Sequence, residues 1–143
     1  MVSMVLMAAG LALTAGPATE AIMGALPAAR VGAGSAVNDT TREIGGTLGV
    51  AIVGSVMNSI YGSHLVAALG GTSLTPEQVS TASRSVSGGF EAAALVPPAE
   101  SASVAAATSQ AFVDGLSAGS WVAAATTALA AVCVLIFLPA RHR

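Results

Sequence analysis

From Gly115 to Leu138 the chain reads GLSAGSWVAAATTALAAVCVLIFL, with no ionisable group except Cys133. Pro139 ends the run, and the basic tail 141–143 follows it. A helix needs about 20 mainly apolar residues to cross the hydrocarbon core of a bilayer, which is about 30 Å thick. The run meets that length, so it predicts a transmembrane helix over about 111–138.

Two earlier segments meet the same criterion. The first runs from Val2 to about Leu26 and is interrupted only by Pro17 and Glu20. The second is uncharged from Ile44 to Ile60 and has a polar lead-in from Ala33. We therefore expect helices over about 2–26 and 34–64, with a long outer loop over about 65–110.

The composition supports a chain covered by lipid. Hydrophobic residues make up 54% of the sequence, charged residues only 8%, and the mean hydropathy is +0.78. A soluble domain carries about 25% charged residues. We predict an all-α membrane protein whose 143 residues form one transmembrane section and whose main partner is the lipid bilayer. The five arginines are scattered and the net charge is −2, so nucleic acid is excluded as a partner.

The arginines also predict an orientation. With three spans, the turn 27–38 and the C-terminus lie on one side of the membrane, and the loop 65–110 lies on the other. Four arginines fall on the first side (Arg30, Arg42, Arg141 and Arg143), whereas only Arg84 falls on the second. By the positive-inside rule we expect a multi-pass protein of the plasma membrane with a cytoplasmic C-terminus and an extracellular loop.

The loop contains its own helix signals. Thr75-Pro76-Glu77-Gln78 is typical of a helix start, with a threonine cap, a proline at the first position and a glutamine three residues on. A second short helix is predicted from about Glu100 through Phe112 into the last span. A disordered excursion is the alternative for this loop.

No residue pattern indicates catalysis. His64, His142 and Cys133 stand apart in the sequence and offer no metal-ligand spacing. Neither a Ser-His-acid set nor a phosphate-binding glycine motif is apparent. We therefore predict neither an enzyme nor a protein with a metal or cofactor.

The residues 10–62 carry the most specific pattern. A glycine-rich helix with Pro17 is followed by PAARVGAGS at 27–35, then by NDTTREIGGTLG at 38–49. This order resembles the late helices of the fourteen-helix drug:proton antiporters of the major facilitator superfamily, the EmrB/QacA type. The loop and the last helix match that family only in layout.

The resemblance implies the C-terminal fragment of an exporter of small amphipathic or cationic compounds, driven by inward proton flow. Such transporters need two six-helix halves. The missing N-terminal helices are thus an implied partner, and this section is not expected to transport alone. The first segment has no basic residue before Arg30, which argues against a secretory signal peptide.

Four polar residues are candidates for the substrate or proton pathway, or for gating. Glu20 is the only acid inside an apolar span, and intramembrane carboxylates usually face a cavity or a partner. Solvation at the membrane surface, or pairing with Asn38 or Arg42 across the hairpin, is the alternative. Asn38, Asp39 and Arg42 form either a gating network or a solvated helix end, and Asp39 can pair with Arg42 on one helical face.

The small residues predict helix packing. Gly45 and Gly49, like Gly115 and Gly119, form GxxxG pairs that let helix backbones approach closely in lipid. Gly46 and Gly54 extend the small-residue set, and Pro17 predicts a kink. Tyr61 and Trp121 are expected as aromatic anchors at the outer membrane boundary.

Two other functional classes remain open. One is a free-standing three-helix membrane protein with a structural or partner-binding role. The other is a secreted, alanine-rich helical protein with a cleaved leader, which would require the run 115–138 to be soluble.

Overall fold

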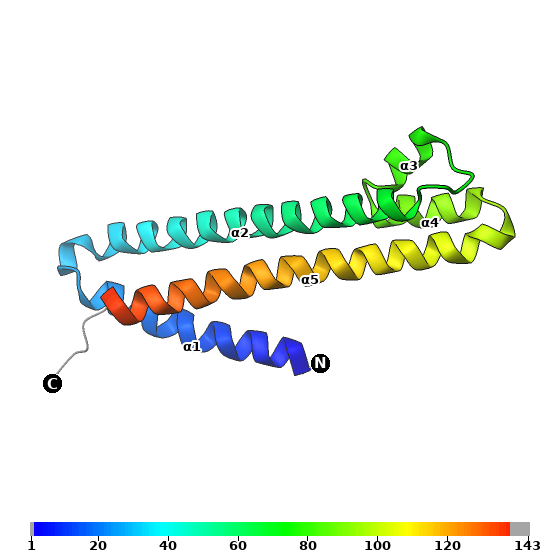
Figure 1. The fold of residues 1–143 in the computed structure, drawn as a ribbon. Helices are drawn as coiled ribbons and strands as arrows, with labels where there is room; N and C mark the ends of the chain where they lie inside the picture. Colours follow the sequence, from blue (N-terminus) through cyan, green and yellow to red (C-terminus); the bar gives the residue numbers. More distant parts are fainter. Residues whose placement is uncertain (1, 138–143) are drawn as a thin grey trace. The chain divides into compact units, whose positions relative to one another are not determined.

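The computed structural model describes residues 2–137, and these residues contain helices and no strand. In chain order they are α1 (Val2–Gly24), η1 (Ala28–Arg30), α2 (Val31–Ala68), α3 (Pro76–Ala82), α4 (Val86–Leu95) and α5 (Pro98–Phe137) (Figure 1). Three of them, α1, α2 with η1, and α5, are long and apolar enough to cross a membrane. The prediction of an all-α membrane protein with three spanning helices is confirmed. Leu138, Pro139 and the basic tail lie outside the described residues.

The long helices extend beyond the apolar runs that predict them. α2 continues to Ala68, and α5 begins at Pro98, so the short helix and the span expected over 100–138 are one helix. Pro98 opens α5, where its missing N–H is not needed, and no proline follows it before Pro139. At 1.5 Å per residue, α2 is about 57 Å and α5 about 60 Å long, each roughly twice the thickness of the hydrocarbon core.

The chain divides into two compact units between Leu48 and Gly49. The first unit holds α1, with Pro17 inside it, then η1 and the start of α2. Pro27 is extended, and the N–H of Arg30 donates to its carbonyl oxygen at 2.8 Å, which closes the turn. The side chain of Leu26 lies where a Cβ on Gly34 would stand. A larger residue at Gly34 would have to displace the end of that side chain.

The second unit has a packed core that joins the end of α2, α3, α4 and the first half of α5. The buried hydrophobic residues come from all four helices and their connections: Tyr61, Leu65, Leu69, Ala82, Ala92, Ala93, Val96, Val104 and Ala111. Thr108 is fully buried among them, and its hydroxyl donates to the carbonyl oxygen of Val104 at 2.9 Å. The segment 65–110 is therefore a folded helical cap and not a disordered excursion.

The predicted start of α3 is confirmed. The hydroxyl of Thr75 accepts a hydrogen bond from the N–H of Gln78 at 3.3 Å, and the side chain of Gln78 accepts one from the N–H of Thr75 at 2.8 Å. This reciprocal pair is a capping box. Ser85 caps α4 in a similar way by accepting from the N–H of Gly88 at 3.0 Å.

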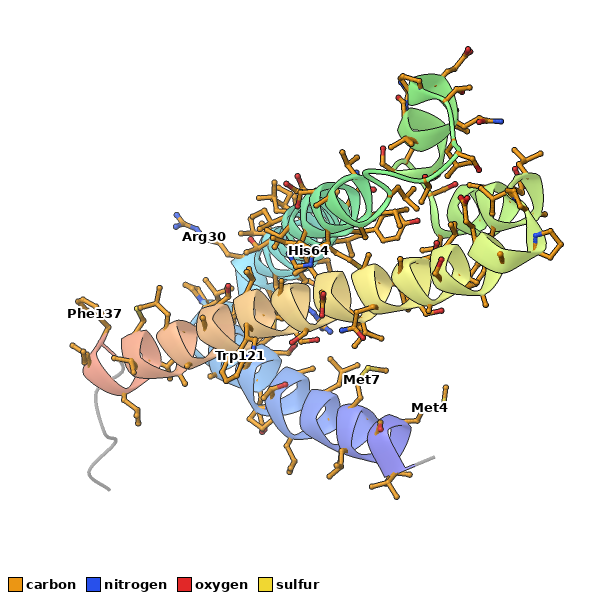
Figure 2. All side chains as sticks on the ribbon, turned by 45° about the vertical axis from the view of Figure 1, so that its right-hand side comes forward. Met4, Met7, Arg30, His64, Trp121 and Phe137 are labelled. Carbon is orange, nitrogen blue, oxygen red and sulfur yellow. The ribbon has the colours of Figure 1, made fainter. Side chains whose placement is uncertain are left out.

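Tyr61 does not act as an anchor in the lipid interface. Its side chain is only 2% exposed, and its hydroxyl lies 3.0 Å from the carbonyl oxygen of Ala82 and 2.9 Å from that of Ser85. The prediction was wrong because the cap covers this end of α2. Trp121 is 74% exposed and projects from α5 (Figure 2), as a lipid-facing ring would.

Candidate functional site

The four polar candidates lie in the first unit, where Glu20 is on α1 and Asn38, Asp39 and Arg42 are on α2. Asn38 is partly buried and the other three are exposed. Within residues 2–137, no hydrogen bond or ion pair joins Glu20 to Asn38 or Arg42, nor Asp39 to Arg42; a hydrogen-bonded pair of a histidine and a carboxyl group lies elsewhere, between His64 and Asp114. Their roles in transport or gating stay predictions.

Asn38 also lines a cavity of about 400 Å³ beside the α1–α2 turn. The cavity is mostly apolar, with walls from Ile22, Leu26, Arg30, Ala33, Gly34, Val37, Asn38 and Thr41. The hydroxyl of Thr41 donates to the carbonyl oxygen of Val37 at 2.8 Å, so the amide of Asn38 and the guanidinium of Arg30 are the polar groups that remain for a ligand. Arg30 extends outward from the turn (Figure 2). An apolar wall with one amide and one cation can accommodate a side chain of a neighbouring helix or an amphipathic molecule.

The predicted packing glycines fall into two groups. A Cβ on Gly115 would lie 2.7 Å from the backbone oxygen of Met57, and one on Gly119 would lie 3.2 Å from Cγ1 of Val53. These two glycines therefore mark a close approach of α5 to the second half of α2. Among the described residues, a Cβ on Gly45, Gly46, Gly49 or Gly54 would meet no atom within 4 Å.

The open glycines indicate a surface that another helix could use. Gly45 and Gly49 are four residues apart, so they share one face of α2. In lipid, such small residues permit close backbone contact. Their role in packing stays a prediction, because a Cβ on either glycine would meet no described atom within 4 Å.

A polar cluster in the second unit was missed from the sequence. Nδ1 of His64 on α2 lies 2.9 Å from Oδ2 of Asp114 on α5, and the side-chain amide of Gln110 donates to Oδ1 of Asp114 at 2.9 Å. The side chains of His64 and Asp114 are 51% and 36% exposed. A cavity of about 420 Å³ adjoins them, with alanines of both helices in its wall. Figure 2 labels His64 on α2.

The sequence suggested that His64 stands alone, but the structure shows that it contacts Asp114. It follows the apolar part of α2, and Asp114 immediately precedes the apolar part of α5. Both residues lie just beyond the loop-side end of an apolar run, and this was a signal that an antiparallel pair of helices would bring their side chains near each other. Among residues 2–137, no group of three or more His, Cys, Asp or Glu side chains could hold a metal ion.

The chain is similar to the multidrug efflux pump LfrA of Mycolicibacterium smegmatis, with 33% identity over 133 residues. The match covers 93% of this chain and 26% of the pump, so the chain spans about a quarter of that relative's length. No family model matches the chain. No solved structure matches it either. The relative is an efflux pump by its name, and the three long apolar helices of this chain are consistent with a multi-pass membrane protein.

Proposed function

We propose that this chain is one section of a proton-coupled efflux transporter of the plasma membrane, of the fourteen-helix drug:proton antiporter type. The alignment of 93% of the chain with a multidrug efflux pump is the observation that supports this most. The three long apolar helices are the kind of segment that such a pump requires. Small amphipathic or cationic compounds are the proposed substrates.

The remaining helices of the transporter are the proposed partners of this section. Two open features of the first unit support this: the face with Gly45, and the cavity lined by Asn38. An apolar surface and a small-residue face in lipid both favour contact with further helices. The chain alone is therefore not expected to transport.

Within the complete transporter, we assign the proton or cation pathway to Glu20 and inner gating to the polar groups of α2. Glu20 is exposed on α1, and a carboxylate at membrane depth is stable only where it meets water, a proton or a cation. Asn38 and Arg42 stand near the turn that follows α1. The excess of arginine around that turn supports a cytoplasmic position for it and an extracellular position for the cap.

A chimera tests the proposal directly. The aligned segment of the Mycolicibacterium smegmatis pump is replaced by this chain, and the loss of a preloaded fluorescent lipophilic cation is followed in cells without other exporters. We expect export by the chimera, none by the chain alone, and none by the pump without the segment. A protonophore should abolish export, and Glu20→Gln should reduce it at least tenfold, whereas Glu77→Gln in α3 should not.

A chimera that reaches the membrane at the normal level and exports nothing would refute the proposal. If the chain alone then also formed a stable membrane species, the free-standing structural protein would be the better interpretation. Unchanged export in the Glu20→Gln chimera would remove only the role of that carboxylate.

A further inference from the structure

The cavity beside the α1–α2 turn has a volume of about 400 Å³, which lies within the range of small-molecule sites, about 300–1,000 Å³. Every residue of its wall belongs to the first compact unit, which ends at Leu48. The proposed function treats this cavity as open surface. What fills it is a separate question, which the chemistry of the wall can answer.

The inner part of the wall is neutral and its outer part carries one charge. Leu26, Gly34 and Asn38 are the partly buried members of the wall, and the other five residues are exposed. The side chain of Leu26 packs against Gly34, so these two residues form an apolar floor. Arg30 is the one charged residue of the wall. A ligand that fits both parts therefore has an apolar chain with a negative charge beside it.

The turn holds the backbone of Arg30 and leaves its side chain available to a ligand. The N–H of Arg30 donates to the carbonyl oxygen of Pro27 at 2.8 Å at the end of η1. The side chain is exposed and extends outward from the turn (Figure 2). Among residues 2–137, no hydrogen bond or ion pair engages its guanidinium group. Because a guanidinium can bind a phosphate through two parallel N–H bonds, phosphate is the anion that this group fits best.

The sequence on either side of the turn places the cavity near the surface of the bilayer. The apolar run of α1 reaches Leu26, and Arg30 follows four residues later. An arginine near the end of a membrane helix extends toward the lipid headgroups. The molecules that present both an acyl chain and a phosphate at this level are the phospholipids of the bilayer.

We propose that this cavity binds one anionic phospholipid, with its phosphate on the guanidinium of Arg30 and an acyl chain along Leu26 and Gly34. The amide of Asn38 is neutral and can donate to an ester oxygen of the lipid. Basic pockets beside membrane helices bind anionic headgroups in this way. A zwitterionic lipid has the same phosphate, but its own cation offsets the attraction to Arg30. A free phosphate ion has no apolar part to cover the floor.

Photocrosslinking of lipid to the full chain tests this site. The chain is placed in nanodiscs of phosphatidylcholine with a minor share of phosphatidylglycerol, and a photoreactive acyl chain is carried by one lipid or by the other. Mass spectrometry counts cross-links at residues 22–41 relative to those at 123–137, an exposed part of α5 that reports ordinary lipid contact. We expect the anionic probe to exceed the zwitterionic probe at 22–41 by about fivefold, the effect of one arginine near a membrane surface.

Two pairs of variants separate the charge from the apolar space. Arg30→Gln should bring the ratio of the two probes close to one, whereas Arg84→Gln, which removes the same charge from the second unit, should leave it unchanged. Ala33→Phe fills the cavity, so it should lower cross-linking of both lipids at 22–41. Ala36→Phe adds the same ring to an exposed position outside the wall and should not. Circular dichroism checks that each variant keeps its helices, and Arg30→Gln alone decides the matter if Ala33→Phe does not fold.

Equal yields of the two probes at 22–41, or an unchanged ratio in Arg30→Gln, would overturn the site and leave only ordinary contact with lipid. In the efflux chimera the anionic cross-link should persist. Its loss there would show that a further helix fills the cavity, which would also overturn the assignment. None of these measurements depends on export, so a failure of this site and a failure of the proposed function can be told apart.

Discussion

Gly115 lies where α5 comes closest to the second half of α2, and it offers a quantitative test of that contact. A Cβ at this position would lie 2.7 Å from the backbone oxygen of Met57 and 3.4 Å from its Cγ. Because real Cβ atoms essentially never come closer than 3.0 Å to another heavy atom, Gly115→Ala must separate the two backbones by at least about 0.3 Å. The oxygen belongs to the helix itself, so no side-chain rotation can relieve the clash.

The expected destabilisation follows from two opposing terms. Extra atoms in a packed contact cost about 1–3 kcal/mol, while alanine stabilises a helix interior by about 1 kcal/mol relative to glycine. Gly54→Ala in the same unit gains the second term alone, since its Cβ would meet no described atom within 4 Å. The difference between the two variants therefore isolates the contact, and we expect it to be about 1–3 kcal/mol.

Unfolding of the purified chain in mixed micelles, titrated with a denaturing detergent, measures this difference. Circular dichroism follows the helices, and Trp121, the single tryptophan of the chain, follows the surroundings of α5. We expect Gly115→Ala to unfold at a lower detergent fraction than the unmodified chain and Gly54→Ala at an equal or higher one. Equal midpoints for the two alanine variants would show that α2 and α5 do not meet at Gly115.

Three further substitutions probe the cap and the open face. Tyr61→Phe removes the hydroxyl that contacts the carbonyl oxygens of Ala82 and Ser85, of which the second still accepts from the N–H of Gly89. Local opening of α3 and α4 should become easier by about 1 kcal/mol, and amide exchange there should be faster. Thr75→Ala removes half of the capping box, so the stability of α3 should fall by about 1 kcal/mol. Amide hydrogen exchange should become faster in the first turn of α3 and stay unchanged in α5. Gly45→Leu should leave the unfolding midpoint of the isolated chain unchanged, because no described atom covers that position. In the efflux chimera the same change should abolish export, which separates contact with other helices from contact within this chain.

The three long helices could be predicted from the sequence, because an apolar run of about 20 residues is expected to cross a bilayer as a helix. The same criterion measures only hydropathy and gives a last span over about 111–138; the helix expected separately from about Glu100 through Phe112 into that span is the first part of α5, which begins at Pro98. Helix termini were predictable where side chains satisfy the first N–H groups, as at Thr75. They were not predictable where the helix simply runs on, as α2 does to Ala68.

The sites were harder to predict because they depend on register between helices. The GxxxG pattern occurs at Gly45 and at Gly115, yet only the second has a neighbour within the described chain. The positions of His64 and Asp114 beside their apolar runs allowed a contact, but only the register of α2 against α5 shows that the two side chains meet. Tyr61 fits the composition of a membrane interface, and only the packing of the cap makes it a core residue.

The hydroxyl of Tyr61 also has a mechanical consequence. Its two carbonyl partners, Ala82 and Ser85, flank the corner between α3 and α4. Any torsion of the end of α2 about its own axis would pull on that corner and would swing both short helices with it. A protein bound to α3 and α4 would therefore resist rotation of α2 without contacting α2 itself.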